Sequence, residues 1–125
     1  MIPTDRKYTK DHEWVLVSGN VAKIGITDHA QSALGDIVFV DVPAVGDSFN
    51  IGDSFAVVES VKAASEIYTQ VAGKVVEVNE MLDAQPELIN SDPYGAFLAA
   101  IEFTALDESA FLSAEQYEAL IASEA

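Results

Sequence analysis

One lysine stands apart in this chain, because basic residues are scarce and this one lies between two β-rich segments. Lys62 is one of 6 lysines and arginines, against 21 aspartates and glutamates. Glu59 precedes it and Glu66 follows it. A primary amine placed in this way is suited to covalent attachment of a group rather than to solubility. The alternative is that acids and lysine, three and four residues apart, form an ordinary ion-pair ladder on a helix.

The segments on both sides of Lys62 favour strands over a helix. Residues 55–58 and 67–78 are rich in valine, isoleucine and aromatic residues, which are typical of half-buried strands. Residues 60–64 are then the connection between two strands, and Lys62 is predicted at or near the tip of a hairpin. Such loops are exposed and often carry function on a rigid scaffold. An enzyme could reach the amine there.

Several separate motifs follow one another along residues 8 to about 95. They are Tyr8-Thr9-Lys10-Asp11-His12-Glu13-Trp14, Gly25-Ile26-Thr27-Asp28-His29-Ala30-Gln31, Leu34-Gly35-Asp36, Glu59-Ser60-Val61-Lys62-Ala63 and Asn90-Ser91-Asp92-Pro93-Tyr94-Gly95. In this order they resemble the H protein of the glycine cleavage system, and their number makes the match far more specific than one short motif. The resemblance implies that Lys62 carries lipoic acid in amide linkage, within the attachment motif formed with Glu59, Ser60, Val61 and Ala63.

The same resemblance implies a non-catalytic carrier subunit, because a group carrier leaves the reactivity to its cofactor. The arm would take an aminomethyl group from a pyridoxal-phosphate glycine decarboxylase (P protein). It would pass the one-carbon unit to a tetrahydrofolate-dependent aminomethyltransferase (T protein), and a dihydrolipoyl dehydrogenase (L protein) would reoxidise it. A lipoate ligase or lipoyl transferase would attach the cofactor.

The family also implies a cleft that shelters the loaded arm. Glu13 matches a cleft position, and Asp11 and Glu66 fall beside it as acids able to pair with an ammonium group. The alternative for Asp11 and Glu66 is that they are solvated surface acids.

Three departures from the family pattern affect details of this cleft. Ala33 replaces a frequent histidine, Gln70 replaces a frequent proline, and the segment Tyr94-Gly95-Ala96-Phe97-Leu98 is shortened and lacks a tryptophan. They leave open an alternative function, in which an H-like paralogue acts in lipoate transfer to other enzymes.

Length and composition bound the function classes. The 125 residues are expected to form a single domain, residues 1–125, with half of them apolar. The net charge of −15 argues against nucleic-acid binding. No apolar run is long enough to cross a membrane, and the start lacks the apolar segment of a secretory signal. We therefore expect a cytoplasmic protein without membrane or nucleic-acid partners, and a monomer.

Other chemistries fit the residues less well. Gly46-Asp47-Ser48 and Gly52-Asp53-Ser54 resemble an esterase nucleophile block, but both histidines, His12 and His29, lie upstream of either serine and the Gly-x-Ser-x-Gly elbow is incomplete. The absence of cysteine and of a His-Glu-x-x-His motif gives no predicted metal site. A biotin carrier shares the hairpin, but such carriers usually place methionines beside the lysine, where this chain has Val61 and Ala63.

The elements that must position these residues are mostly short strands separated by turn residues. We expect a hairpin closed at Gly19-Asn20, a short helix from Thr27 or Asp28 to Gly35, a strand over 37–42, and turns in the repeated Gly-Asp-Ser segments. We also expect a turn at Ala72-Gly73, a strand over 74–78, one helical turn near 79–82, a loop over 83–93, and a last strand over 97–103. Ser113 and Gln116 fit a capping box that begins a terminal helix.

This succession predicts a mainly β fold with short helices and a C-terminal helix. The family resemblance sharpens this prediction to the lipoyl/biotinyl-type barrel-sandwich hybrid.

Overall fold

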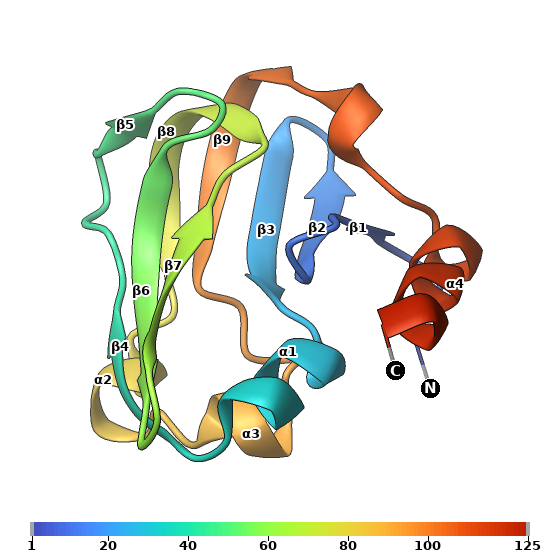
Figure 1. Ribbon diagram of the computed structural model, residues 1–125. Helices are drawn as coiled ribbons and strands as arrows, with labels where there is room; N and C mark the ends of the chain where they lie inside the picture. Colours follow the sequence, from blue (N-terminus) through green and yellow to red (C-terminus); the bar gives the residue numbers. More distant parts are fainter. Residues whose placement is uncertain (1, 125) are drawn as a thin grey trace.

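The computed structural model describes residues 2–124, and two antiparallel sheets make up most of it (Figure 1). The larger sheet has the strand order β1-β2-β3-β9-β8-β5, and the smaller has β4-β6-β7. The strands are β1 Lys7–Tyr8, β2 Glu13–Ser18, β3 Val21–Ile26, β4 Ile37–Asp41, β5 Ser48–Phe49, β6 Ser54–Ser60, β7 Ala64–Tyr68, β8 Val71–Val78 and β9 Ala99–Leu106. The predicted mainly β fold is confirmed.

Both sheets contribute to one apolar core. Ile24 of β3, Val75 of β8 and Ile101 of β9 are buried from the larger sheet, and Val58 of β6 and Ile67 of β7 from the smaller. Alternation along each strand sends these side chains inward and their neighbours outward. The smaller sheet is therefore held to the core by its inner face.

Within residues 2–124, four α-helices and one 3-10 turn connect or cover the sheets. They are α1 Asp28–Leu34, α2 Met81–Ala84, α3 Leu88–Ser91, η1 Glu108–Ala110 and α4 Ala114–Glu124. Helix α1 begins as predicted, because the Thr27 side chain accepts a hydrogen bond from the Ala30 amide, and it ends at Gly35 with φ +85°. In Figure 1, α1, α2 and α3 lie at the same end of the molecule as the turn between β6 and β7.

The C-terminal helix α4 packs on the other side of the larger sheet, beside β1 (Figure 1). Its capping box is confirmed: the Gln116 amide donates to Ser113 Oγ at 3.1 Å, and the Ser113 amide donates to Gln116 Oε1 at 2.9 Å. Tyr117 stacks on Tyr8 with ring centroids 4.8 Å apart, in a second buried cluster with Trp14. None of the helices within residues 2–124 is long and apolar enough to cross a membrane.

The predicted turns are confirmed at three places. Strands β2 and β3 form a hairpin in which Ser18 pairs with Val21. The two Gly-Asp repeats form the same kind of turn, since Gly46 and Gly52 both have positive φ. In each, the aspartate carboxylate accepts a backbone amide three residues earlier, from Ala44 to Asp47 and from Asn50 to Asp53.

The predicted turn at Ala72-Gly73 is wrong, because both residues lie inside β8. A Cβ atom at Gly73 would stand 2.1 Å from the Glu102 carbonyl oxygen of β9, so glycine here allows two backbones to approach beside a β-bulge. Two boundaries also differ. The predicted loop over 83–93 contains α3, and the last strand runs over 99–106 rather than 97–103.

Candidate functional site

The predicted hairpin around Lys62 is present, and Lys62 lies at its tip. Strands β6 and β7 pair up to Glu59 and Ala64, and the Ser60 amide donates to the Ala63 carbonyl at 2.8 Å. The Lys62 side chain is exposed. The ion-pair ladder on a helix is excluded, because Glu59 and Glu66 lie in two different strands. Within residues 2–124, the ion pairs do not include Lys62.

The hydroxyl of Ser60 holds the backbone of this tip. Its Oγ accepts hydrogen bonds from the amides of Lys62 and Ala63, both at 3.2 Å, and lies 3.2 Å from the Ala63 carbonyl, to which it donates. A serine that bonds to nearby amides in this way stabilises a turn without needing glycine. The predicted attachment residue Ser60 thus has a structural task, whereas Val61 is 67% exposed beside the lysine.

The tip also rests on the corner between α1 and β4. The Val61 amide donates to the Asp36 carbonyl at 3.1 Å. The Lys62 side chain runs past Gly35, where an added Cβ would lie 3.4 Å from Lys62 Cε. The amine is therefore presented from a supported turn and not from a free loop.

The side chain of Asn90, on α3, holds the corner between α1 and β4 by hydrogen bonds. The sequence analysis did not assign this role. Asn90 Oδ1 accepts the Ile37 amide at 2.9 Å, and its Nδ2 donates to the Gly35 carbonyl at 2.9 Å and to Gln31 Oε1 at 2.8 Å. These bonds use both ends of the amide side chain. Asn90 and Asp36 both stand in the motifs that match the family, so that match was the signal that could have singled them out.

The three predicted cleft acids gather around Tyr68, at the opposite end of β7 from Lys62. Glu13 Oε2 accepts the Tyr68 amide at 2.8 Å, and the Tyr68 hydroxyl lies 3.3 Å from Glu66 Oε2. The charges of Glu66, and less strongly of Asp11 and Glu13, raise the pKa of Tyr68. Asp11 and Glu66 are exposed.

Glu13 differs from the other two acids because it is buried, with a relative exposure of 2%. Its Oε1 accepts a hydrogen bond from the Thr9 hydroxyl at 3.1 Å. Burial raises the pKa of Glu13 to about 7, and the Tyr68 amide and Thr9 hydroxyl partly oppose that rise. This carboxyl group therefore changes charge near neutral pH, in a buried position beside the exposed acids Asp11 and Glu66.

The serines of the two esterase-like segments and the two histidines lie in different parts of the fold. Ser48 lies in β5 and Ser54 begins β6. The imidazoles instead face the C-terminal helix: His12 Nδ1 lies 2.8 Å from the Tyr117 hydroxyl, and Nε2 atoms of both histidines lie near Glu124. The serine segments serve as turns, as described above.

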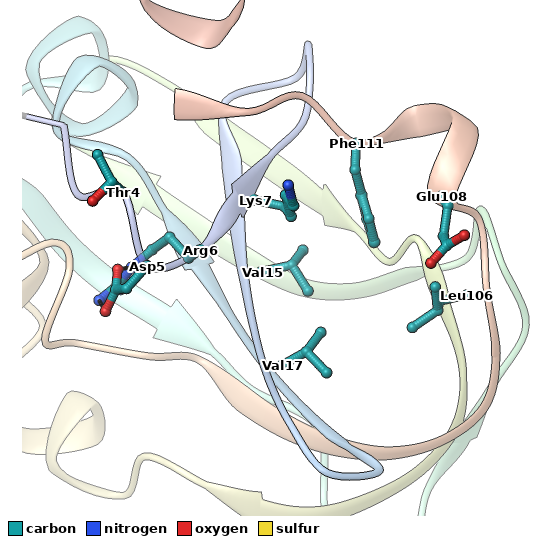
Figure 2. A pocket seen from close by; sticks show the side chains of 9 residues that line it. All are labelled: Thr4, Asp5, Arg6, Lys7, Val15, Val17, Leu106, Glu108 and Phe111. Atoms are coloured by element: carbon teal, nitrogen blue, oxygen red, sulfur yellow. Dashed lines mark hydrogen bonds and ion pairs between the residues drawn. The ribbon is translucent and has the colours of Figure 1, made fainter. Parts of the chain in front are cut away.

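A cavity of about 370 Å³ lies beside β1 and β2 (Figure 2). In Figure 2, Val15 and Val17 of β2 line one side, and Phe111 and Leu106 line the other. Arg6 at its rim donates to Asp5 and to the Tyr94 carbonyl, and its guanidinium lies 4.6 Å from the Trp14 ring centroid. The arginine is thus engaged in structural contacts. The cavity is lined by Thr4, Asp5, Arg6, Lys7, Val15, Val17, Leu106, Glu108 and Phe111, and none of these belongs to the Lys62 hairpin.

The departures from the family pattern fall around these sites. Ala33 is exposed on α1, and Gln70 lies in the β7–β8 turn. In the shortened segment, Asp92 accepts the amides of Gly95 and Ala96, and Lys23 Nζ lies 4.7 Å from the Phe97 ring centroid. A phenylalanine therefore supplies an aromatic surface in the segment that lacks the tryptophan.

Comparison with known proteins bears on all of these features. Residues 6–124 match the family described as "Glycine cleavage H-protein". A glycine cleavage system H protein of Carboxydothermus hydrogenoformans is 53% identical, over 99% of this chain and 97% of its own. One of Herpetosiphon aurantiacus is 51% identical, over 99% and 96% respectively.

A solved structure gives the same result for the fold. The crystal structure of a glycine cleavage system H protein from Mycobacterium marinum superposes with a TM-score of 0.90 at 38% identity, over 97% of this chain and 99% of that one. The predicted barrel-sandwich fold of the lipoyl type is thus confirmed. This chain belongs to the glycine cleavage H-protein family.

Proposed function

We propose that this protein is the lipoyl-lysine carrier of a glycine cleavage system, and that Lys62 is the attachment residue. The observation that carries the proposal is an exposed amine, free of ion pairs within residues 2–124, at the tip of a hairpin braced by Ser60 and Asp36. A ligase or lipoyl transferase needs such an accessible amine. When bound, the cofactor supplies a disulfide that cycles through a dithiol and carries the transferred group.

The residues of this chain then present and shelter the arm and do not catalyse. The carrier would meet the glycine decarboxylase, the aminomethyltransferase and the dihydrolipoyl dehydrogenase in turn. Tethering raises the local concentration of the carried group at each partner. The prediction that the protein acts in the cytoplasm as a monomer stays a prediction.

Intact-mass measurement tests the attachment. Protein from lipoate-sufficient cells should carry one lipoyl increment, and Lys62→Arg should carry none, because an arginine cannot form the lipoyl amide. Lys74→Arg is the matched control, since Lys74 is also an exposed lysine, on β8. A biotin increment, or lipoate retained in Lys62→Arg, would overturn the assignment.

Reconstitution separates the two carrier roles. With the three partner enzymes, the lipoylated protein should support glycine-dependent release of carbon dioxide. Transfer of its lipoyl group to other acceptor proteins, without support of glycine cleavage, would instead favour the lipoate-relay paralogue.

We also propose that the acids around Tyr68 hold the loaded arm. An aminomethyl group ends in a cationic amine, which the exposed acids Asp11 and Glu66 would attract and the buried Glu13 would hold. A charge-assisted hydrogen bond is worth on the order of 1.5–3 kcal/mol. Glu13→Gln should therefore leave lipoylation intact and speed spontaneous loss of the aminomethyl group roughly tenfold. Formaldehyde and ammonia release over time is the measurement, and decay equal to the wild type would exclude Glu13 as a guard.

A further inference from the structure

Two histidines and one glutamate, far apart in the sequence, converge where α4 ends. His12 precedes β2, His29 lies in the first turn of α1, and Glu124 ends α4. Their nearest ligand atoms, one from each residue, all lie within 4.8 Å of one another. Glu124 Oε1 is 3.2 Å from His12 Nε2 and 3.7 Å from His29 Nε2. The Lys62 hairpin takes no part in this cluster.

The two separations between Glu124 and the histidines match those of atoms that share one metal ion. Two ligands each about 2.1 Å from a tetrahedral zinc ion lie about 3.4 Å apart, which falls between these two separations. Two imidazoles and a carboxylate are also the ligand set that first-row transition ions accept, whereas Ca²⁺ and Mg²⁺ prefer oxygen ligands alone.

A second hydrogen-bonded layer holds His12 in the orientation that a ligand needs. Its Nδ1 lies 2.8 Å from the Tyr117 hydroxyl, which lies 2.7 Å from Thr27 Oγ1. Tyr117 is fully buried, so this series of hydrogen bonds is held rigidly. Metal-bound histidines characteristically use their other ring nitrogen in such a bond. The Nε2 atom of His12 is thereby left facing Glu124.

The backbone of His12 is also unusual, with φ +69°. A left-handed conformation at a non-glycine residue persists only where its surroundings hold it. Here the His12 amide donates to the Thr9 carbonyl, and the His12 carbonyl accepts the Thr27 amide. The turn brings the ring to 4.6 Å from the His29 ring, centroid to centroid.

Space for further ligands lies next to the cluster. A cavity of about 300 Å³ is lined in part by Asp28, His29 and Tyr117. It has room for water, and the Asp28 carboxylate adds negative charge at its wall. The net charge of −15 raises the local concentration of cations around the protein.

We propose that His12 Nε2, His29 Nε2 and Glu124 Oε1 form a binding site for a divalent transition-metal ion such as zinc. The ion joins the end of α4 to the turn before β2 and to the start of α1, and water from the adjacent cavity completes its coordination. The site is independent of the carrier role of Lys62.

The test is a zinc titration of the tag-free full chain by calorimetry, with Mg²⁺ in excess to occupy weak carboxylate sites. We expect one saturable site per chain. His29→Asn and Glu124→Gln should each weaken zinc binding by roughly tenfold or more, and Tyr117→Phe, which removes the partner of His12 Nδ1, by roughly tenfold. Glu118→Gln is the matched control, an exposed glutamate on the same helix, and should bind as the wild type does.

Two controls keep the result interpretable. A reduced lipoyl arm binds zinc through its own thiolates, so no thiol reductant is present and Lys62→Arg is titrated alongside. Equal binding in Lys62→Arg and wild type shows that the result does not depend on the proposed carrier function.

Nuclear magnetic resonance tests the site without any substitution, because the chain has only 2 histidines. Both sets of imidazole ring signals should shift together and saturate at one equivalent of zinc. Unshifted ring signals, or zinc affinity unchanged in both His29→Asn and Glu124→Gln, would overturn the site and leave imidazole–carboxylate contacts only.

Discussion

Strand β7 begins at an exposed turn and ends against a buried carboxyl group. At the first end, the Ser60 hydroxyl and the Val61 amide hold the backbone of the tip, and the Lys62 side chain is exposed. At the other end, the Tyr68 amide donates to Glu13, which is 2% exposed. The amine must be free for an enzyme to modify it, whereas a strand that presents it must be anchored. The anchoring therefore lies away from the attachment point.

The difference between the two ends predicts unequal effects on stability. Glu13→Ala leaves a cavity and removes the acceptor of the Tyr68 amide and the Thr9 hydroxyl, so at pH 5 it should lower the free energy of unfolding by roughly 4 kcal/mol. Lys62→Ala should change it by less than about 0.5 kcal/mol, as exposed sites do. Urea denaturation of both variants measures this. Similar losses in the two would show that the tip is also part of the anchor.

The pH dependence of stability should sharpen the same comparison. The pKa of Glu13 is raised from 4.5 to about 7 in the folded protein, so the folded state holds this proton more tightly than the unfolded chain. The stabilisation is complete below about pH 4.5 and is lost as pH rises through about 7.

Glu13→Gln resembles the protonated acid and lacks this titration. Relative to it, wild type should therefore lose on the order of 3 kcal/mol of unfolding free energy between pH 4.5 and 8. The measurement is urea unfolding of both proteins across that range. Parallel pH profiles would mean that the pKa of Glu13 is not raised.

The support under Lys62 can be removed from a distance. Asn90→Ala leaves the Ile37 amide and the Gly35 carbonyl without their partner, which should cost roughly 2 kcal/mol of unfolding free energy. It should also slow lipoylation of Lys62 several-fold, because the corner that braces the tip loosens. Asn79→Ala is the control, since Asn79 Oδ1 accepts only a long bond from Met81. If the destabilised Asn90→Ala is lipoylated at the wild-type rate, the hydrogen bonds of Asn90 are not needed to present the amine.

The Ser60 hydroxyl at the tip is expected to matter less for stability than Asn90. Ser60→Ala removes the acceptor of two exposed amides, which water can replace, so the unfolding free energy should fall by less than about 1 kcal/mol. Lipoylation should persist at a lower initial rate, as measured by mass spectrometry over time with a limiting ligase. Ser65→Ala, on β7, is the comparison variant. Complete loss of lipoylation in Ser60→Ala would mean that the ligase reads the serine directly.

Local patterns predicted the elements that depend on neighbouring residues. The Lys62 hairpin, the Thr27 cap and the Ser113 capping box each involve residues within a few positions of one another, and all are confirmed. The turn predicted at Gly73 is wrong, because glycine is needed there for the close approach of the β9 backbone. That contact is with Glu102, 29 residues later in the chain. Such a contact leaves no mark in the local pattern.

The sequence by itself determined that Lys62 stands on an exposed β-hairpin and that the chain resembles one family, because strand periodicity, turn residues and motif order are properties of the chain. Only the tertiary structure decided that Glu13 is buried, that Asn90 braces the Gly35–Ile37 corner, and that His12 and His29 meet Glu124. These outcomes depend on burial and on hydrogen bonds between segments distant in sequence, which exist only once the two sheets and α4 have packed.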